Sequence, residues 1–119
     1  MNKIQGVWAR CFDDMIIYEI NDTLEDIQRV VDGHFEVVRL WDGIVLLCKE
    51  DGRIDGYSKL NMSIFRDRNN PHDSFWIFGD AFFCAEQEGP DGGEFVSLSD
   101  EQLQSLRDYA AYWYEEELK

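Results

Sequence analysis

The sequence predicts an α+β fold in which a mixed or antiparallel sheet packs against two helices. Two observations predict it. Short apolar runs separated by Gly-containing turns recur along the chain, as is typical of strands, and two segments carry helix caps and apolar residues at three-to-four spacing. The strands come in runs rather than alternating with helices, which favours α+β over a βαβ series. A length of 119 residues suits one domain, residues 1–119.

The first part of the chain predicts a hairpin followed by a helix. Apolar residues on both sides of Asp13 and Asp14, between residues 4 and 18, indicate strand, turn and strand. Thr23 is then a favourable N-cap, and apolar residues recur at helical spacing after it. Gly33 is placed to end this helix in a left-handed conformation.

The next segments predict the sheet. Asp42-Gly43 between the apolar runs Phe35–Arg39 and Ile44–Lys49 is the strongest short hairpin signal in the chain. The continuous apolar run Ile44–Lys49 indicates a central strand. We expect residues 75–84, two strands separated by a Gly-Asp step, to join these two strands in one sheet that packs against both helices. Residues 57–65 are ambiguous, with an irregular stretch expected around Asn61.

The last part predicts a loop and a helix. Residues 88–94 contain three glycines and are expected to form a loop. Ser99 and Gln102 have the spacing of a capping box at the start of the final helix. Aromatic residues cover more than one face of that helix, so Tyr112 or Tyr114 is expected to be exposed to a partner or to a second copy. A homodimer is one such arrangement, and core packing is the other use of the aromatic stripe.

The cysteines, histidines and motifs give no sign of a cofactor, a metal or a catalytic residue. Cys11, Cys48 and Cys84 are odd in number and far apart, so we expect buried free thiols in a reducing, cytoplasmic setting. Neither His34 nor His72 has metal-ligand spacing to a cysteine. The acidic turn at residues 50–56 lacks the carboxylates that a calcium loop requires. We therefore expect a protein that is not an enzyme.

Charge is the most informative property of the sequence. Twenty-five Asp and Glu against eleven Lys and Arg give a net charge of −14, which disfavours direct binding to nucleic acid or to an anionic membrane. Residues 69–119 carry −10 of this charge. Such a surface resembles nucleic-acid phosphates and would attract a basic protein, although acidic surfaces also serve solubility alone. The residues that we expect to contact a basic partner are Glu86, Glu88, Asp91, Glu94, Asp108, Glu115, Glu116 and Glu117.

A second hypothesis uses the basic residues of the central loop. Arg66 and Arg68, together with Asn61, form the one region suited to an anion. Trp76 or Phe65 would stack on a base, which would make this region a site for a nucleotide second messenger. The alternating charges of the loop favour a plain solvated surface over such a site.

Several motifs resemble a known family. They are Leu24-x-x-Ile27-Gln28-x-x-Val31-x-Gly33-x-Phe35-Glu36-Val37-Val38, the turn at residues 48–56, Asn61, residues 78–83 and the helix start at residues 97–102. From Leu24 onward the chain resembles domain-of-unknown-function family 3846 of phages, plasmids and other mobile elements. In place of the Leu-Pro step that precedes Asn in the family, Lys59-Leu60 precede Asn61 here. The resemblance carries no catalytic residue, and it implies an accessory gene of the kind that often opposes host defence.

These observations lead to one main hypothesis and one alternative. The main hypothesis is a non-enzymatic counter-defence inhibitor that presents its acidic surface to a basic, nucleic-acid-binding host protein. The alternative is a small-ligand-binding protein that sequesters a nucleotide second messenger.

Overall fold

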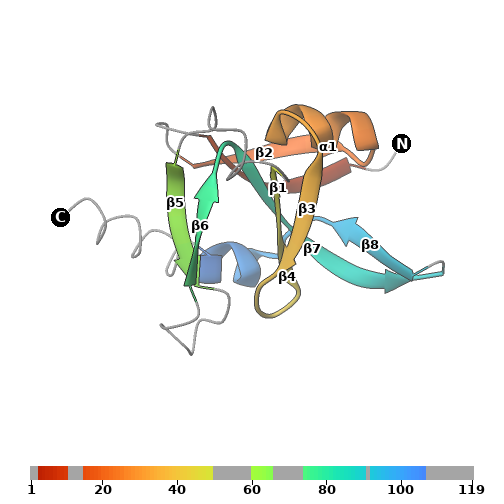
Figure 1. Ribbon diagram of the computed structural model, residues 1–119. Coiled ribbons are helices and arrows are strands. Elements are labelled where there is room, and N and C mark those ends of the chain that lie inside the picture. Colours follow the sequence, from red (N-terminus) through yellow and green to blue (C-terminus); the bar gives the residue numbers. More distant parts are fainter. Residues whose placement is uncertain (1–2, 11–14, 50–59, 66–73, 91, 107–119) are drawn as a thin grey trace.

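The computed structural model describes residues 3–10, 15–49, 60–65, 74–90 and 92–106 (Figure 1). In chain order, the elements with defined bounds are β1 (Lys3–Ala9), β2 (Ile16–Asn21), α1 (Leu24–Val31), β3 (Phe35–Arg39), β4 (Ile44–Lys49), β5 (Leu60–Phe65), β6 (Ser74–Phe78), β7 (Ala81–Gly89) and β8 (Gly92–Val96). Residues 100–106 are helical as well.

The main sheet is antiparallel. Its six strands follow the order β2-β1-β7-β4-β3, with β8 pairing on β7, and every pair is antiparallel. Strands β5 and β6 form a separate two-stranded sheet. The α+β class is confirmed, and the sheet is antiparallel rather than mixed.

The placement of residues 75–84 in one sheet is wrong. Strand β6 pairs with β5 in the small sheet, whereas β7 pairs with β1 and β4 in the main sheet. Between them Gly79 has a φ of 79°, a left-handed conformation that a residue without Cβ adopts at little cost. The chain therefore leaves one sheet and enters the other at this glycine.

The hairpin of β3 and β4 has the bounds that the sequence predicts. Asp42 and Gly43 both take positive φ angles, of 51° and 79°. The amide of Ile44 donates to the carbonyl oxygen of Trp41 at 2.9 Å, which closes the turn. Asp and Gly are among the residues that tolerate this backbone conformation best, which is why the pair predicts the turn so reliably.

Local side-chain hydrogen bonds fix the start of α1 and the start of the helix at residues 100–106. The hydroxyl of Thr23 accepts from the amide of Asp26 at 3.2 Å, as a predicted N-cap should. At the other end the left-handed residue is Asp32, with φ of 60°, one position before the predicted Gly33. A short polar side chain is the usual exception to the glycine rule at this position. Ser99 and Gln102 form the predicted capping box, with reciprocal bonds of 3.1 and 2.9 Å.

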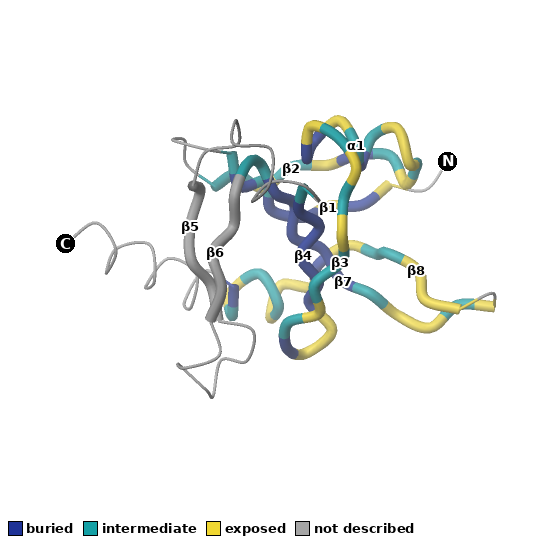
Figure 2. The backbone as a smooth tube through the Cα atoms, in the orientation of Figure 1, coloured by how far each residue is buried: buried dark blue, intermediate teal, exposed yellow. Residues whose placement is uncertain are grey.

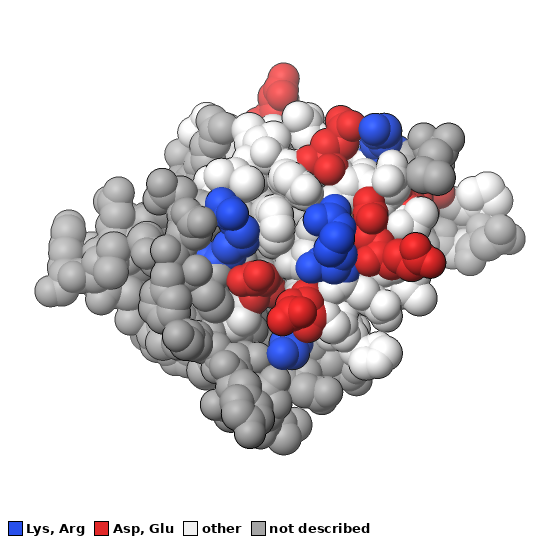
Figure 3. All heavy atoms as spheres, turned by 90° about the horizontal axis from the view of Figure 1, so that it is seen from above, with Lys and Arg blue, Asp and Glu red and all other residues white. Residues whose placement is uncertain are grey.

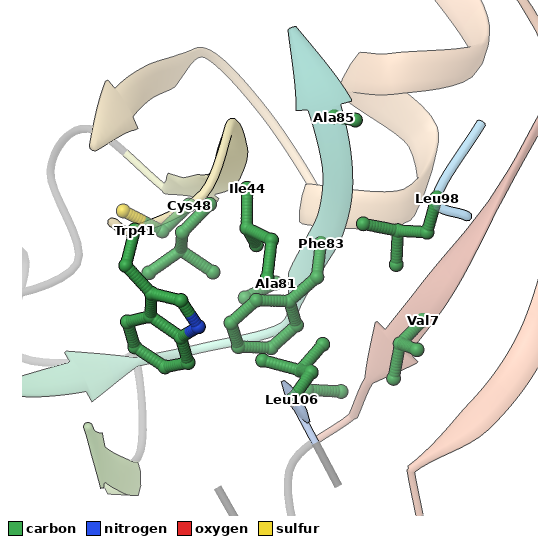
Figure 4. Packing of buried hydrophobic residues seen from close by; sticks show 11 residues of the cluster. Val7, Trp41, Ile44, Cys48, Ala81, Phe83, Ala85, Leu98 and Leu106 are labelled. Carbon is green, nitrogen blue, oxygen red and sulfur yellow. The ribbon is translucent and has the colours of Figure 1, made fainter. Parts of the chain in front are cut away.

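The sheet is buried on both faces (Figure 2). Side chains alternate along β7, so Phe82 belongs to the cluster that packs beneath α1, and Phe83 belongs to the cluster on the opposite face. Figure 4 shows Phe83 lying near Trp41 and Leu106, the latter from the second helix. Both phenylalanines are fully buried, with 0% exposure, which places the core around β4 and β7.

Three smaller predictions are tested by the described residues. Strands β1 and β2 pair as the predicted first hairpin, whose turn lies outside the described residues. The pairing of β5 with β6 shifts register between Leu60 and Met62, where an irregular stretch was expected around Asn61. Cys48 and Cys84 are buried free thiols, as predicted, and Cys11 lies outside the described residues.

Candidate functional site: an acidic two-stranded ribbon

The acidic ribbon consists of residues 86–89 of β7 and of β8. Strand β4 pairs with β7 only as far as Ala85, and its turn makes one last bond, from the Glu86 amide to the Gly43 carbonyl oxygen at 2.9 Å. Beyond this point β8 is the one described strand that pairs with β7. The ribbon therefore projects past the β3–β4 hairpin (Figure 1).

The predicted loop at residues 88–94 is therefore wrong, because these residues form most of a hairpin. Gly89 pairs with Gly92, so only two residues separate the last paired positions of the two strands. The glycines that suggested a loop instead allow the two strands to approach and turn. Local composition does not distinguish these two outcomes.

The register decides which carboxylates share a face. Residues directly opposite each other in an antiparallel pair project to the same side of the sheet. Glu86 lies opposite Phe95, and Phe95 packs against the cluster beneath α1, so Glu86 and Glu88 lie on the α1 face. Glu94 lies opposite Gln87 and thus on the other face. The ribbon is acidic on both sides rather than along one continuous surface.

The glycines of the ribbon make room for these carboxylates. A Cβ added to Gly93 would lie 3.1 Å from a carboxylate oxygen of Glu86. A Cβ added to Gly89 would lie 3.0 Å from the carboxyl carbon of Glu94. Each carboxylate therefore lies diagonally across the partner strand, over a residue that has no side chain.

The carboxylates differ in how far they are neutralised. Arg39 donates to both carboxylate oxygens of Glu86, at 2.8 and 3.1 Å, and these hydrogen bonds raise the pKa of the Arg39 guanidinium. Glu94 accepts one bond from the neutral Gln87 side chain at 3.0 Å. Glu88 and Glu94 are exposed, and among the residues that the structure describes neither has a cationic partner. The sequence has no Lys or Arg between Arg68 and Arg107.

One face of the molecule carries charges of both signs. Figure 3 looks onto the molecule from above in the view of Figure 1, and Lys and Arg side chains lie between Asp and Glu side chains on this face. The charge on this face therefore does not form a uniform acidic layer, whereas Glu88 and Glu94 of the ribbon have no cationic partner among the described residues.

A shallow hollow of about 570 Å³ lies between the β3–β4 turn and the second helix. Its polar lining already makes internal hydrogen bonds. Gln102 donates to the carbonyl oxygen of Asp42 at 2.8 Å, and Ser105 accepts from the indole of Trp41 at 2.9 Å. These bonds attach the turn to the helix, so the lining residues serve packing.

The structure brings together only part of each predicted site. Of the acidic set, Glu86, Glu88 and Glu94 share the ribbon, while Asp91, Asp108, Glu115, Glu116 and Glu117 lie outside the described residues. Of the anion site, Asn61 lies in β5, and Arg66 and Arg68 lie outside the described residues, as do Tyr112 and Tyr114. Sequence reasoning missed Arg39 as the partner of Glu86, because the two are far apart in the chain.

The described residues contain neither a metal-binding cluster nor a membrane-spanning helix. In the described part of the chain, no group of three or more His, Cys, Asp or Glu residues is arranged to hold a metal ion. No helix among the described residues is long and apolar enough to cross a membrane. His34 is exposed and contacts the Gln28 side chain at 3.5 Å, and His72 is outside the described residues.

Comparison with models of known protein families shows to which family the chain belongs. Residues 13–111 match the model of a domain of unknown function, DUF3846. The chain belongs to the DUF3846 family. No curated protein and no solved structure matches it.

The extent of the DUF3846 match is informative about the fold. It begins at residue 13, so it includes the acidic ribbon and excludes β1 (Lys3–Ala9). Strand β1 nevertheless lies inside the sheet, between β2 and β7. The DUF3846 region of this protein is therefore completed by a strand from outside the matched residues.

Proposed function

We propose that this DUF3846 protein is a protein-binding module, without a catalytic centre of its own, that holds a basic partner on the acidic ribbon. The observation that supports the proposal is the exposure of Glu88 and Glu94 on a projecting hairpin, with no cation near them among the described residues. Carboxylates in this position are available to Lys and Arg side chains of another protein.

The electrostatics of the chain fit such a partner. A net charge of −14 speeds the encounter with a cationic protein and makes the association sensitive to salt. A single exposed ion pair contributes only about 0–1 kcal/mol, so several pairs and the surface of the ribbon must act together. The partner is therefore expected to carry a cationic groove or strand rather than one basic residue.

A nucleic-acid-binding host protein has the required chemistry, because it must present cationic groups to phosphates. Occupation of those groups by the ribbon would block nucleic acid. This is the basis for extending the proposal to a counter-defence inhibitor carried by a mobile element and acting in the cytoplasm.

The proposal is tested by affinity capture from host lysate, with the retained proteins identified after elution between about 50 and 300 mM salt. We expect basic proteins to be retained by the natural chain and lost when Glu88→Lys and Glu94→Lys are combined. The control combines Glu19→Lys and Glu36→Lys, which changes net charge equally at exposed positions on β2 and β3. Retention of the same proteins by the ribbon variant, or loss in the control as well, would overturn the proposal.

A further inference from the structure

The outer edge of β8 has backbone groups that point away from β7. The bond from the Glu86 amide to Gly43 shows that Glu86 directs its backbone toward β4. Hydrogen-bonding direction alternates along an antiparallel strand, so Gln87 and Gly89 direct theirs toward β8, to Glu94 and Gly92. Residues 93 and 95 of β8 alternate with Gly92 and Glu94, so they direct their N–H and C=O groups outward.

This edge is open in the described structure. No described residue donates to or accepts from the backbone of Gly93 or Phe95. Just beyond β8 the backbone is paired again, because the Leu98 amide donates to the Gln5 carbonyl oxygen of β1 at 3.0 Å. Ser97 also accepts from the Gln5 amide at 2.8 Å, so the base of the ribbon is fixed to β1, while Gly93 and Phe95 make no backbone hydrogen bond to any described residue on the outer edge.

An unpaired strand edge is a template for another strand, and its charge decides which strand fits. Pairing of β8 with β8 of a second copy would bring together two chains of −14, with Glu94 on each edge. Like charges on neighbouring strands are destabilising, whereas opposite charges across a strand pair are favourable. The edge is therefore matched to a basic strand and not to itself.

We infer that the outer edge of β8 takes up an extended, Lys- or Arg-bearing segment of the basic partner as an added antiparallel strand, a mode of binding that rests on the function proposed above. The segment bonds to the backbone of Gly93 and Phe95. The residue opposite Glu94 is basic, and the residue opposite Phe95 is apolar, because Phe95 is half-buried against the cluster beneath α1. Alternating basic and apolar residues are therefore the preferred sequence of the occupant.

Synthetic peptides test the mode of binding without changing the protein. The probe is a fluorescent peptide of about eight residues in which Lys and Val alternate, long enough to cover a typical strand. With Lys opposite Glu94, the Val amides point to β8 and the Lys amides point away. N-methylation of every Val removes the inward donors, and N-methylation of every Lys removes only outward ones, so the two modified peptides have the same charge and the same number of methyl groups.

We expect the unmodified and Lys-methylated peptides to bind in fluorescence anisotropy at low salt, and the Val-methylated peptide to lose detectable binding. Each backbone hydrogen bond lost corresponds to about a fivefold change in affinity. Equal binding by all three peptides would refute strand addition and leave the acidic ribbon as a binding surface. Absence of binding by every peptide, with no effect of Glu88→Lys and Glu94→Lys, would refute the proposed function itself.

A pair of variants tests the same edge from the side of the protein. Gly93→Pro removes the outward amide of Gly93 without touching a bond between β7 and β8, whereas Gly93→Ala retains that amide. Both variants place a Cβ close to the Glu86 carboxylate, so the steric effect on Glu86 is the same in the two. We expect the Pro variant to bind the unmodified peptide at least fivefold more weakly than the Ala variant. Equal affinities for the two variants would overturn the inference.

Discussion

Replacement of Gly6 by Ala tests whether β1 and β7 approach as closely as the structure shows. A Cβ at Gly6 would overlap the carbonyl oxygen of Phe83 and would lie 2.7 and 2.8 Å from two ring atoms of Phe82. The oxygen belongs to the backbone, and the Phe82 ring has 0% exposure, so neither can move into free space. Overpacking of a core usually lowers the free energy of unfolding by about 1–3 kcal/mol. We expect about 3 kcal/mol here, because the added Cβ would clash with two rigid groups.

The assay is urea unfolding followed by tryptophan fluorescence, with Gly93→Ala as the control. The Cβ added at Gly93 meets only the Glu86 side chain, whose carboxylate end lies 3.1 Å away and can shift by a few tenths of an ångström toward solvent, so a change of at most about 0.5 kcal/mol is expected. Gly6→Ala should lower the urea midpoint strongly and Gly93→Ala should leave it nearly unchanged. If the two variants unfold at the same urea concentration, the close approach of β1 to Phe82 and Phe83 is refuted.

Three further predictions follow from single interactions. Trp41→Phe removes the 2.9 Å bond to Ser105 and part of a buried ring, so it should cost about 2 kcal/mol in urea unfolding, and Ser105→Ala added to it should cost little more. Burial raises the pKa of the Cys84 thiol to about 12, so native Cys84 should resist alkylation at pH 8 and react after unfolding. Because the folded thiol stays protonated while the unfolded one ionises, stability should fall as pH rises from about 8.5 toward 12, and Cys84→Ala should reduce that slope. Arg39→Met should barely shift the urea midpoint, because the side chain is 69% exposed, yet it should modestly increase binding of a Lys-bearing peptide at low salt, because one positive charge near the ribbon is removed.

Local features of the fold were predictable from the sequence because they depend on neighbouring residues. Thr23 and Ser99 cap helices through bonds that span three residues. Asp42 and Gly43 form a turn because both tolerate a positive φ. In each case the interacting groups are close in the chain, and their geometry follows from the residue types.

Long-range features were not predictable in the same way. Nothing in the residues of β6 and β7 shows that they pair with different strands, since both are short apolar runs. The acidic residues of the candidate site were recognised by type, but their division between two faces depends on register, and a shift by one residue would exchange the faces. The Arg39–Glu86 pair depends on β3 and β7 lying on either side of β4, which a single sequence does not reveal.

The position of β7 at the centre of the sheet affects how the protein is made. Residues 7–9 of β1 pair with residues 81–83 of β7, and β4 pairs with β7 on its other side. Closing a flexible loop as long as the one between β1 and β7 has an entropic cost of about 4 kcal/mol. On the ribosome the β1–β2 and β3–β4 hairpins emerge before β7. At a synthesis rate of about 5–20 residues per second, one edge of the apolar strand β4 therefore stays unpaired for several seconds. Aggregation of the nascent chain is expected in that interval, and rapid synthesis of residues 50–89 would shorten it.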